Sequence, residues 1–575
     1  MDTRERYVYW RDSEIFDEKT RAEVAALEGD DKEIEDRFYK DLEFGTGGLR
    51  GVIGAGTNRM NIYTVGRATQ GLADYIIKNH GESKGVAIAY DSRHMSVEFS
   101  EAAALVLCAN GIKAYRFESL RPTPELSFAV RELGCIAGIV VTASHNPPEY
   151  NGYKVYWEDG AQVTPPHDVG IISQVNSITD FSLIKTMDRK EAESRGLFVT
   201  IGEDIDSRYM ACLKKLVLSP EAIAAEGKNL KAVYTPLHGT GNIPARRVLK
   251  EIGFEHIEVV PEQEKPDGDF PTVGYPNPED PNVYKLALEQ AKKIDADLIL
   301  ATDPDADRLG VYAKDSRTGE YKSFTGNMSG LLLCEYQLAR KKEKGLLPAN
   351  AAVVKTIVST NMTDAVAADY GCKLFQVLTG FKYIGEKIKE FEQTGEYEYE
   401  FGFEESYGCL IGTHARDKDA IVAVMALCEA AAYYKTKGIT LWDRMIELYE
   451  KYGYFKEGAV SLTFKGIEGA NKIKSILEGL RGRQITTIGS FDVKTVSDYS
   501  TGITTDPKTG KTSPTGLPKS NVLYYDLSDD AWCCVRPSGT EPKIKFYFGV
   551  KGKSMEDADR LLEELSDAMM KLKDE

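Results

Sequence analysis

The chain has 575 residues, of which 42% are hydrophobic and 28% are charged, and its formal net charge is −17. This length is too great for one hydrophobic core and indicates roughly four domains of about 150 residues each. The negative charge argues against a nucleic-acid partner and against binding to an anionic membrane surface.

The apolar and cysteine residues bear on the location of the protein. No apolar run reaches the roughly 20 residues that cross a bilayer, and the charged N-terminal stretch 1–6 lacks the apolar region of a secretory signal. The nine cysteines form no C-x-x-C pair and show no zinc-ligand spacing. We therefore expect a reducing, cytoplasmic location and no contact with a membrane.

Taken in chain order, residues 1–40 are charged and helix-forming, and they predict a helical N-terminal cover. Apolar strands then alternate with helical segments. The expected strands are 86–90, 136–141, 231–234, 297–301 and 352–358, and the expected helices include 99–110 and 284–293. This alternation predicts doubly wound α/β layers with parallel strand pairing.

The pattern changes near residue 455, where strands begin to follow one another. The expected strands are 460–464, 490–496, 521–527, 531–535 and 543–550, with helices at 467–480 and 555–573. Residues 500–520, rich in Thr, Gly, Pro and Lys, predict a surface loop. The fold class is thus α/β, with three similar doubly wound α/β domains and a C-terminal α+β domain. The predicted domains are 1–205, 206–320, 321–450 and 451–575.

The segment 142–147, with the sequence TASHNP, directly follows the apolar strand 136–141. The Asn-Pro-Pro that follows stops the strand, so Ser144 is presented at a strand's carboxyl end, where chemistry usually lies in an open α/β sheet. A turn without chemistry and a serine hydrolase are the alternatives. A hydrolase lacks support, because there is no G-x-S-x-G elbow and His145 would point away from Ser144 on an extended chain.

Three aspartates at alternate positions follow the strand 297–301: Asp303, Asp305 and Asp307. On an extended segment, this spacing places all three carboxylates on one side. Crowded carboxylates repel one another unless a cation lies among them, and carboxylate oxygens suit Mg²⁺. The spacing favours a magnesium site over an acidic turn. It does not fit an EF-hand, because the required Gly and terminal Glu are missing.

Two later segments have the residues of binding loops. In 401–408, FGFEESYG, the glycines allow backbone approach, and Glu404 and Ser406 can bond adjacent hydroxyls of a ligand. In 536–542, RPSGTEP, one guanidinium, two hydroxyls and a glycine can form an anion cradle. Each segment alone is equally typical of an ordinary turn.

Together these four segments resemble the α-D-phosphohexomutases, the phosphoglucomutase family, whose serine, metal, sugar and phosphate loops come in this order. The string 142–154, TASHNPPEYNGYK, matches the serine loop throughout, and the resemblance covers nearly the whole chain. Segment 43–51, EFGTGGLRG, is similar to the family's N-terminal glycine-rich loop. The family's metal loop often has Gly where this chain has Pro304 and Ala306, so a positive φ there would be awkward.

The resemblance implies the four-domain phosphohexomutase architecture, with one loop per domain feeding a central cleft. It implies an isomerase-class enzyme that interconverts glucose 1-phosphate and glucose 6-phosphate through a phosphoserine and a glucose 1,6-bisphosphate intermediate. Mg²⁺ is then the cofactor, glucose 1,6-bisphosphate the activator, and small-molecule sugar phosphates the partners. The oligomeric state, monomer or dimer, stays open.

The resemblance also assigns roles to individual residues. The catalytic residues would be Ser144, Arg50, His145 and Lys154. The metal ligands would be Ser144, Asp303, Asp305 and Asp307. The substrate-binding residues would be Arg308, Thr379, Gly380, Glu404, Ser406, Lys418, Arg536, Ser538, Gly539 and Thr540.

Several other functions stay open as alternatives. The Glu-Glu-Ser of the sugar loop is the glucose-type pattern, but phosphopentomutase and phosphomannomutase activities belong to the same family. A non-catalytic sugar-phosphate-binding protein would have lost Ser144 or the aspartates, and none is lost. A phosphatase would need an activated water near the phosphoserine, and no residue in the sequence points to one.

Overall fold

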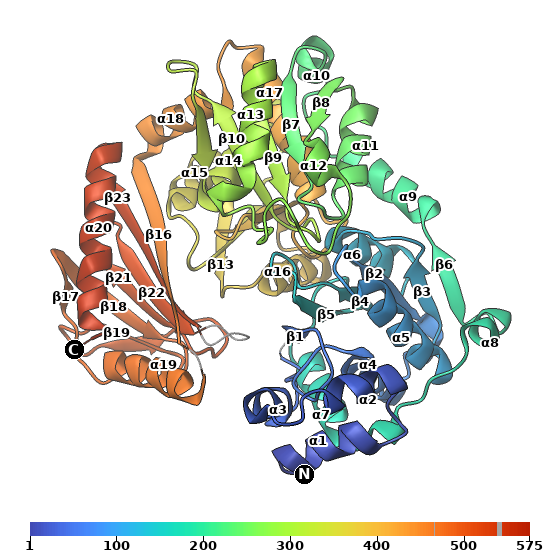
Figure 1. Cartoon of the computed structure of the whole chain (residues 1–575). Helices are drawn as coiled ribbons and strands as arrows, with labels where there is room; N and C mark the ends of the chain where they lie inside the picture. Colours follow the sequence, from blue (N-terminus) through green and yellow to red (C-terminus); the bar gives the residue numbers. More distant parts are fainter. Residues whose placement is uncertain (46, 465, 538–542, 575) are drawn as a thin grey trace.

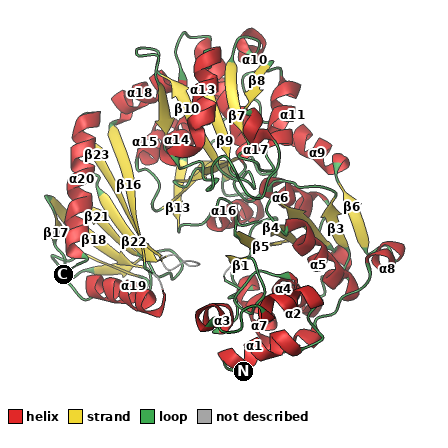
Figure 2. Cartoon of the chain, in the orientation of Figure 1, coloured by secondary structure: helices red, strands yellow, loops and turns green. Residues whose placement is uncertain are grey.

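The chain folds into four sheets with their helices, which follow one another in sequence order (Figures 1 and 2). The structure is a computed structural model that describes residues 1–45, 47–464, 466–537 and 543–574. In Figure 1 the parts form an open arc, from the blue N-terminal part through green and yellow to the red C-terminal part. The predicted class, three α/β domains followed by an α+β domain, is confirmed.

Three short helices form the N-terminal cover, as predicted. They are α1 (Thr3–Asp12), α2 (Glu18–Ala25) and α3 (Asp31–Phe38). Each is preceded by an aspartate whose carboxylate accepts a backbone N–H of the first turn, which satisfies one of the free amide groups there. Trp10 of α1 and Phe38 of α3 are buried in one cluster with Phe16, which lies between α1 and α2.

The first sheet has the strand order β1-β5-β4-β2-β3-β6. Its strands are β1 (Gly48–Val52), β2 (Val86–Tyr90), β3 (Ala114–Phe117), β4 (Ala137–Val141), β5 (Tyr150–Trp157) and β6 (Phe198–Ile201). The helices of this part are α4 (Ile62–Lys78), α5 (Ser96–Ala109), α6 (Thr123–Glu132), α7 (His167–Ser177) and α8 (Arg189–Ser194). Strands β2, β3, β4 and β6 pair in parallel, whereas β5 is antiparallel to β4 and β1 is antiparallel to β5.

The second sheet repeats this plan in the order β11-β10-β9-β7-β8. Its strands are β7 (Lys231–Thr235), β8 (His256–Val259), β9 (Leu298–Thr302), β10 (Leu309–Lys314) and β11 (Tyr321–Phe324). The helices are α9 (Glu203–Lys214), α10 (Pro220–Glu226), α11 (Asn242–Ile252), α12 (Pro261–Glu264) and α13 (Lys285–Ile294). Strands β7, β8 and β9 are parallel, and β10 and β11 add an antiparallel edge.

The third sheet has the order β13-β12-β14-β15 and again ends in an antiparallel edge strand. Its strands are β12 (Ala351–Thr356), β13 (Lys373–Val377), β14 (Glu398–Glu404) and β15 (Gly408–Ile411). The helices are α14 (Gly326–Glu343), α15 (Met362–Tyr370), α16 (Phe381–Thr394), α17 (Ala420–Lys435) and α18 (Leu441–Tyr452). The sequence pattern predicted the parallel strands but not these antiparallel edges, because a hairpin return carries no crossover helix.

The fourth sheet is antiparallel throughout, in the order β16-β23-β22-β21-β18-β19-β20, with β17 paired to β18. Its strands are β16 (Tyr454–Thr463), β17 (Thr487–Ile488), β18 (Phe491–Asp498), β19 (Ile503–Thr505), β20 (Thr512–Pro514), β21 (Leu523–Leu527), β22 (Trp532–Pro537) and β23 (Lys543–Gly552). Helices α19 (Gly466–Arg481) and α20 (Met555–Leu572) accompany it. The expectation of a loop over 500–520 is wrong in part, since a short exposed hairpin, β19–β20, lies there.

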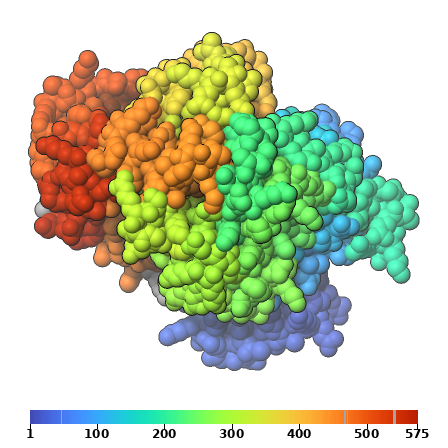
Figure 3. All heavy atoms as spheres, turned by 90° about the horizontal axis from the view of Figure 1, so that it is seen from above, coloured from blue at the N-terminus to red at the C-terminus, as the bar shows by residue number. Residues whose placement is uncertain are grey.

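One apolar core runs through the first three parts of the chain. Helix α17 is apolar around nearly its whole circumference, which is typical of a buried helix, and it contacts α10, α11 and α14. In the view from above (Figure 3), orange spheres lie against both yellow and green ones. A separate cluster joins the third part to the fourth through Ile357 and Leu378 on one side and Trp532 and Tyr547 on the other.

Two expectations about location can be compared with the described residues. No helix among them is both long enough and apolar enough to cross a membrane. All nine cysteines carry free thiols, and Cys533 and Cys534 are buried in β22.

Candidate active site

Ser144 lies in a turn at the carboxyl end of β4, as predicted, and only 3% of its surface is exposed. Its hydroxyl donates a hydrogen bond of 2.7 Å to Oδ2 of Asp303, which follows β9 of the second sheet. The backbone of Ser144 has a φ of +51°, in the left-handed region. The serine loop and the aspartate loop therefore meet at the ends of two neighbouring sheets.

The left-handed turn overturns one expectation from the sequence. His145 was expected to point away from Ser144, but its Nδ1 atom lies 3.2 Å from the serine Oγ. The expectation assumed an extended backbone, and the positive φ of Ser144 removes that assumption. Burial, with the positive charges of Arg308 and Arg50, lowers the pKa of His145 well below its usual value, so the ring is neutral.

The sequence analysis missed Arg93, which holds the serine loop in place. Its guanidinium donates to the backbone carbonyls of Ser144 (2.5 Å), Asn146, Pro147 (2.8 Å) and Tyr150 (3.1 Å). The side chain is fully buried, pairs with Asp91 and lies over the ring of Phe270 from the second part of the chain. The signal was present, because the run Asp91-Ser92-Arg93 follows β2 at the same edge of the sheet as the serine loop.

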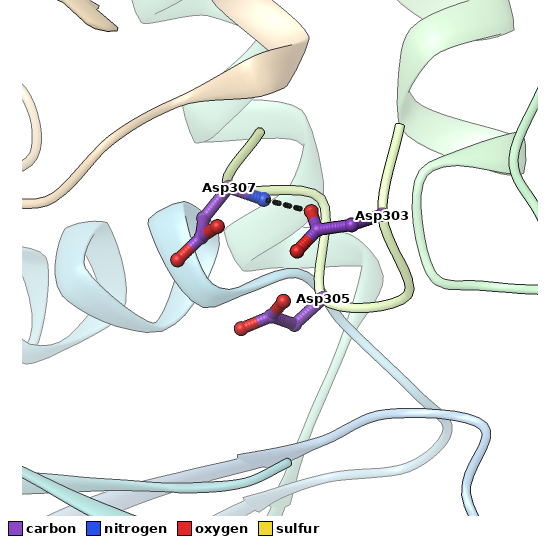
Figure 4. A group of neighbouring side chains, drawn as sticks. All are labelled: Asp303, Asp305 and Asp307. Atoms are coloured by element: carbon purple, nitrogen blue, oxygen red, sulfur yellow. Dashed lines mark hydrogen bonds between the residues drawn. The ribbon is translucent and has the colours of Figure 1, made fainter. Parts of the chain in front are cut away.

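Asp303, Asp305 and Asp307 converge, as Figure 4 shows, with one oxygen of each carboxylate within 4.8 Å of the others. The prediction of convergence is confirmed, but its geometric reason is wrong, because the segment is a turn and not an extended strand. Within this turn Ala306 has a φ of +50°, whereas Pro304 has no positive φ. A residue with a Cβ therefore holds the left-handed position where the family often has glycine, at some cost in backbone strain.

The charges around this aspartate group favour a cation. Burial, together with the negative charges of Asp305 and Asp307, raises the pKa of Asp303 well above its usual value. Burial alone would also raise the pKa of Asp305, but the ammonium of Lys154, 2.8 Å away, outweighs it and holds that pKa well below its usual range. The Oδ1 atoms of Asp305 and Asp307 are buried without a hydrogen-bond partner in the described structure. Three converging carboxylates, two of them with an unpartnered oxygen, are a donor set that a hard divalent cation binds.

Other residues join the neighbouring parts of the chain at this site. Thr123, at the start of α6, donates its hydroxyl to Oδ2 of Asp305 (2.9 Å) and its backbone N–H to the carbonyl of the same residue (2.9 Å). Lys154 on β5 lies 3.7 Å from Asp307, and Lys418 of the third part lies 3.1 Å from the same carboxylate. Thr123 was not predicted, because a threonine at the start of a helix is usually only a cap.

Two arginines lie beside the aspartates and the serine loop. Arg308 donates to Glu279 at 3.1 Å, and its Nε atom lies 3.7 Å from Asp307. Burial would lower the pKa of Arg308, but Asp307 and Glu279 outweigh it and raise that pKa. Arg50 lies on β1, which pairs with β5, and its guanidinium reaches Asn146 of the serine loop at 3.4 Å.

The predicted sugar-contacting residues come together in the third part of the chain. The backbone N–H of Gly380 donates to Oε1 of Glu404 at 2.9 Å, and the Oγ1 atom of the adjacent Thr379 is buried without a partner among described residues. Burial raises the pKa of Glu404, while the positive charges of Lys418 and Arg308 act to lower it. Ser406 is half-buried in the turn between β14 and β15.

The predicted phosphate loop is described only in part. Arg536 is half-buried near the end of β22, and its positive charge acts on Glu405 of the sugar loop. The predictions for Ser538, Gly539 and Thr540 fall outside the described residues.

This arrangement has the parts that phosphoryl transfer needs. A buried serine hydroxyl lies against a carboxylate group that can hold a divalent cation, and Lys154, Arg308, Arg50 and Lys418 surround them. Phosphoryl transfer depends mainly on positioning and on stabilising charge on the moving group, and these side chains supply both.

Comparison with protein families agrees with this geometry. The models of the Phosphoglucomutase/phosphomannomutase alpha/beta/alpha domains I, II and III match residues 41–181, 207–318 and 325–452. Together the three matches span more than half of the chain, and they occur in the family's order.

Known proteins resemble the chain over nearly its whole length. The phosphoglucomutase of Staphylococcus saprophyticus is 36% identical over 527 residues, 92% of this chain and 93% of that protein. The phosphoglucomutase of Staphylococcus epidermidis is 36% identical over 539 residues, 94% of this chain and 95% of that protein.

Two solved structures share the fold at lower identity. The open form of the Paramecium phosphoglucomutase pp63/parafusin aligns with a TM-score of 0.65 at 19% identity, covering 92% of this chain and 96% of that one. A phosphoglucomutase/phosphomannomutase family protein of Burkholderia thailandensis aligns with a TM-score of 0.64 at 20% identity, covering 93% and 98%. With the matching domain models and relatives at 36% identity, the chain belongs to the phosphoglucomutase/phosphomannomutase family.

Proposed function

We propose that this protein catalyses the phosphoglucomutase reaction, the interconversion of glucose 1-phosphate and glucose 6-phosphate. The observation that carries the proposal is the 2.7 Å contact between the Ser144 hydroxyl and Asp303 within the buried carboxylate group. Relatives that are 36% identical and named phosphoglucomutase support the choice of sugar. A nucleophile beside a cation site is what reversible phosphoryl transfer requires.

The proposed reaction begins with Ser144 phosphorylated on Oγ. The bond between this oxygen and phosphorus breaks while a bond forms from phosphorus to the free hydroxyl of the substrate, and the hydroxyl proton ends on the serine oxygen. The product of this half-reaction is glucose 1,6-bisphosphate, which turns over and returns its other phosphoryl group to Ser144. The same bisphosphate would activate an enzyme that has lost its phosphoryl group.

Asp303, Asp305, Asp307 and a phosphoryl oxygen on Ser144 would hold Mg²⁺ in this proposal. The buried, unpartnered Oδ1 atoms of Asp305 and Asp307 fit such an ion. When bound, Mg²⁺ draws negative charge from the phosphoryl group as it moves. Lys154 lies within 2.8 Å of Asp305 and adds positive charge at the same place.

His145 Nδ1, which lies 3.2 Å from Ser144 Oγ, is the candidate acceptor for the proton of the reacting hydroxyl. Lys154, held as an ammonium beside the aspartates, has no lone pair and would instead donate a proton to the leaving oxygen or orient the transferred group. Arg50 and Arg308 would add positive charge around the transferred group, since one reaches the serine loop and the other lies beside Asp307.

The substrate would be held from two sides. Glu404 and Ser406 would bind ring hydroxyls with Thr379, Gly380 and Lys418, and the contact of Gly380 with Glu404 supports this grouping. Arg536, Ser538, Gly539 and Thr540 would hold the phosphate that is not transferred. The positive charge of Arg536 near Glu405 supports an anion site next to the sugar site.

Domain boundaries and location are part of the same proposal. The ranges 1–205, 321–450 and 451–575 each contain the whole of one sheet, which supports these boundaries. The boundary after residue 320 instead separates β11 (Tyr321–Phe324) from the other strands of the second sheet. The nine free thiols support a reducing cytoplasm. The net charge of −17 argues against nucleic acid, and it requires that cations concentrated in the site hold the small anionic substrates against the overall repulsion.

A coupled assay with three substrates tests the proposal. Purified protein with Mg²⁺ and a trace of glucose 1,6-bisphosphate is given glucose 1-phosphate, mannose 1-phosphate or ribose 1-phosphate, and kcat/KM is compared. We expect glucose 1-phosphate to be preferred. Higher kcat/KM for mannose or ribose 1-phosphate would instead identify a phosphomannomutase or a phosphopentomutase. Binding without turnover of any of them would identify a non-catalytic sugar-phosphate-binding protein.

A further inference from the structure

Tyr156 lies on β5 of the first sheet and reaches a loop of the third. The residue is completely buried, and its hydroxyl donates a hydrogen bond of 2.7 Å to Oδ2 of Asp417, which lies between β15 and α17. Burial, with the negative charge of Asp417, raises the pKa of Tyr156 well above its usual value. The phenol therefore stays protonated and acts as the donor.

Asp417 in turn contacts Lys418 through its other oxygen. Oδ1 accepts the backbone N–H of Lys418 at 2.8 Å and its ammonium at 2.9 Å. The same ammonium lies 3.1 Å from Asp307 of the aspartate group. Burial would raise the pKa of Asp417, but Lys418 outweighs it and the pKa is lowered, so the carboxylate is charged. A fixed carboxylate thus holds the ammonium beside the candidate cation site.

Strand β5 directs two of its side chains, Lys154 and Tyr156, toward the candidate active site. Lys154 and Tyr156 are two residues apart and lie on the same face of the sheet, where Lys154 contacts Asp305 and Tyr156 contacts Asp417. Tyr153 lies on the opposite face, is equally buried, and bonds through its hydroxyl to Thr69 within the first part of the chain. One strand thereby carries both a tyrosine that reaches the site and one that does not.

We propose that Tyr156 is a positioning residue for substrate binding, which fixes Asp417 and through it the Lys418 ammonium beside Asp307. This inference rests on the proposed function, in which Lys418 binds the sugar phosphate. The tyrosine hydroxyl fixes the plane of the carboxylate, so that Oδ1 faces the ammonium while Oδ2 is satisfied. Without the hydroxyl, Oδ2 is left buried and unpaired, and the carboxylate rotates to find another partner.

The test compares Tyr156→Phe with Tyr153→Phe in the full-length protein. Each variant loses one completely buried hydroxyl from the same strand, and thermal melting measures the stability that each variant loses. We expect Tyr156→Phe to raise KM for glucose 1-phosphate about tenfold while kcat changes by less than about threefold. Tyr153→Phe should leave both constants near the wild-type values. A merely structural loss would lower kcat with the active fraction and leave KM unchanged.

A double-mutant cycle tests whether the tyrosine acts through Asp417. If it does, Tyr156→Phe/Asp417→Asn should have the KM of Asp417→Asn alone, within about twofold. Additive effects, or a Tyr156→Phe variant indistinguishable from Tyr153→Phe, would overturn the inference while leaving the mutase reaction standing. A wild-type protein that turns over none of the three sugar phosphates would overturn the proposed function, and this inference with it.

Discussion

The hydroxyl of Ser144 and the carboxylate of Asp303 lie 2.7 Å apart, although 159 positions separate them in the sequence. Each follows a strand of a different sheet, and both are nearly or completely buried. A serine with its hydroxyl in this position does not belong to an ordinary surface turn. Its oxygen points toward the carboxylates that would bind a cation. This contact makes the serine the first residue to test.

Replacing Ser144 by Ala should abolish turnover and leave the fold intact. The substitution removes only one hydroxyl, which donates to Asp303 and lies beside His145. Intact-protein mass spectrometry should show one added phosphate on the wild type after exposure to glucose 1,6-bisphosphate and none on the variant. Ser100→Ala, which removes another buried hydroxyl of the same domain, is the control. Wild-type turnover in Ser144→Ala would rule out the phosphoserine mechanism.

Removing the cation should abolish activity. EDTA should stop turnover and added Mg²⁺ should restore it, because three buried carboxylates repel one another without a cation. Asp305→Asn should raise the Mg²⁺ concentration for half-maximal activity by at least about tenfold. Asp315 is a buried aspartate of the same domain that lies outside the group of three, and Asp315→Asn should leave this Mg²⁺ concentration unchanged. Full activity in metal-free buffer would contradict the site.

Much of this site followed from the sequence because its residues lie at the ends of predicted strands. Ser144 and the three aspartates follow the apolar strands β4 and β9, where parallel sheets place their chemistry. The order of the loops then identified the family. Local sequence patterns were enough to find these loops, since each loop can be recognised from about ten consecutive residues.

Contacts between loops could not be predicted in the same way. Arg93 was missed because its partners are backbone carbonyls, which have no sequence signature. Tyr156 and Thr123 were missed because their partners lie in other domains. The orientation of His145 was wrong because the left-handed φ of Ser144 comes from the tertiary fold rather than from local preference.

Arg93→Ala should disorganise the serine loop and lower kcat by at least about a hundredfold, because four carbonyls lose a shared charged donor. Guanidinium ion at millimolar concentration should restore part of the turnover by entering the space left behind. Arg116→Ala, which removes another buried arginine of the same domain that lies over Tyr90, is the control. The assay is kcat with and without guanidinium. A similar loss of kcat in both variants would show that Arg93 contributes only to packing.

Stability should depend on the charge of Glu457, on β16 at the start of the fourth part. Burial raises its pKa to about 7, although the Thr360 hydroxyl and Lys355 act to lower it. The folded state therefore holds a proton that the unfolded state releases near pH 4.5, so this contribution to stability falls as pH rises from about 4.5 through about 7.

Melting curves at pH 5.5 and pH 8 check this dependence. Glu457→Gln should raise the melting temperature more at pH 8 than at pH 5.5, relative to the wild type at each pH. Glu450→Gln, at an exposed position near the end of α18, should show no such difference. Equal shifts in melting temperature at both pH values would show that ionisation of Glu457 hardly destabilises the folded state.

Substrate choice should depend on the sugar loop. A carboxylate at Glu404 and a hydroxyl at Ser406 can each bond a ring hydroxyl of glucose, and Glu404 is already oriented by the Gly380 N–H at 2.9 Å. A site built to bond hydroxyls rejects a sugar that presents them at other distances, because its own polar groups then stay unpaired. Glucose 1-phosphate should therefore be preferred over ribose 1-phosphate, with mannose 1-phosphate behind glucose because its 2-hydroxyl is inverted.

Ser406→Ala should narrow the preference for glucose over ribose 1-phosphate by about five- to tenfold, a change within the range of one lost hydrogen bond. The variant should have a lower kcat/KM for glucose 1-phosphate and a nearly unchanged kcat/KM for ribose 1-phosphate, since the pentose depends less on the Ser406 hydroxyl. Ser359→Ala, at a buried serine of the same domain bonded to Thr356, is the control for stability. If the wild-type protein already turns over ribose 1-phosphate as well as glucose 1-phosphate, Ser406 does not select the hexose and the phosphopentomutase alternative takes its place.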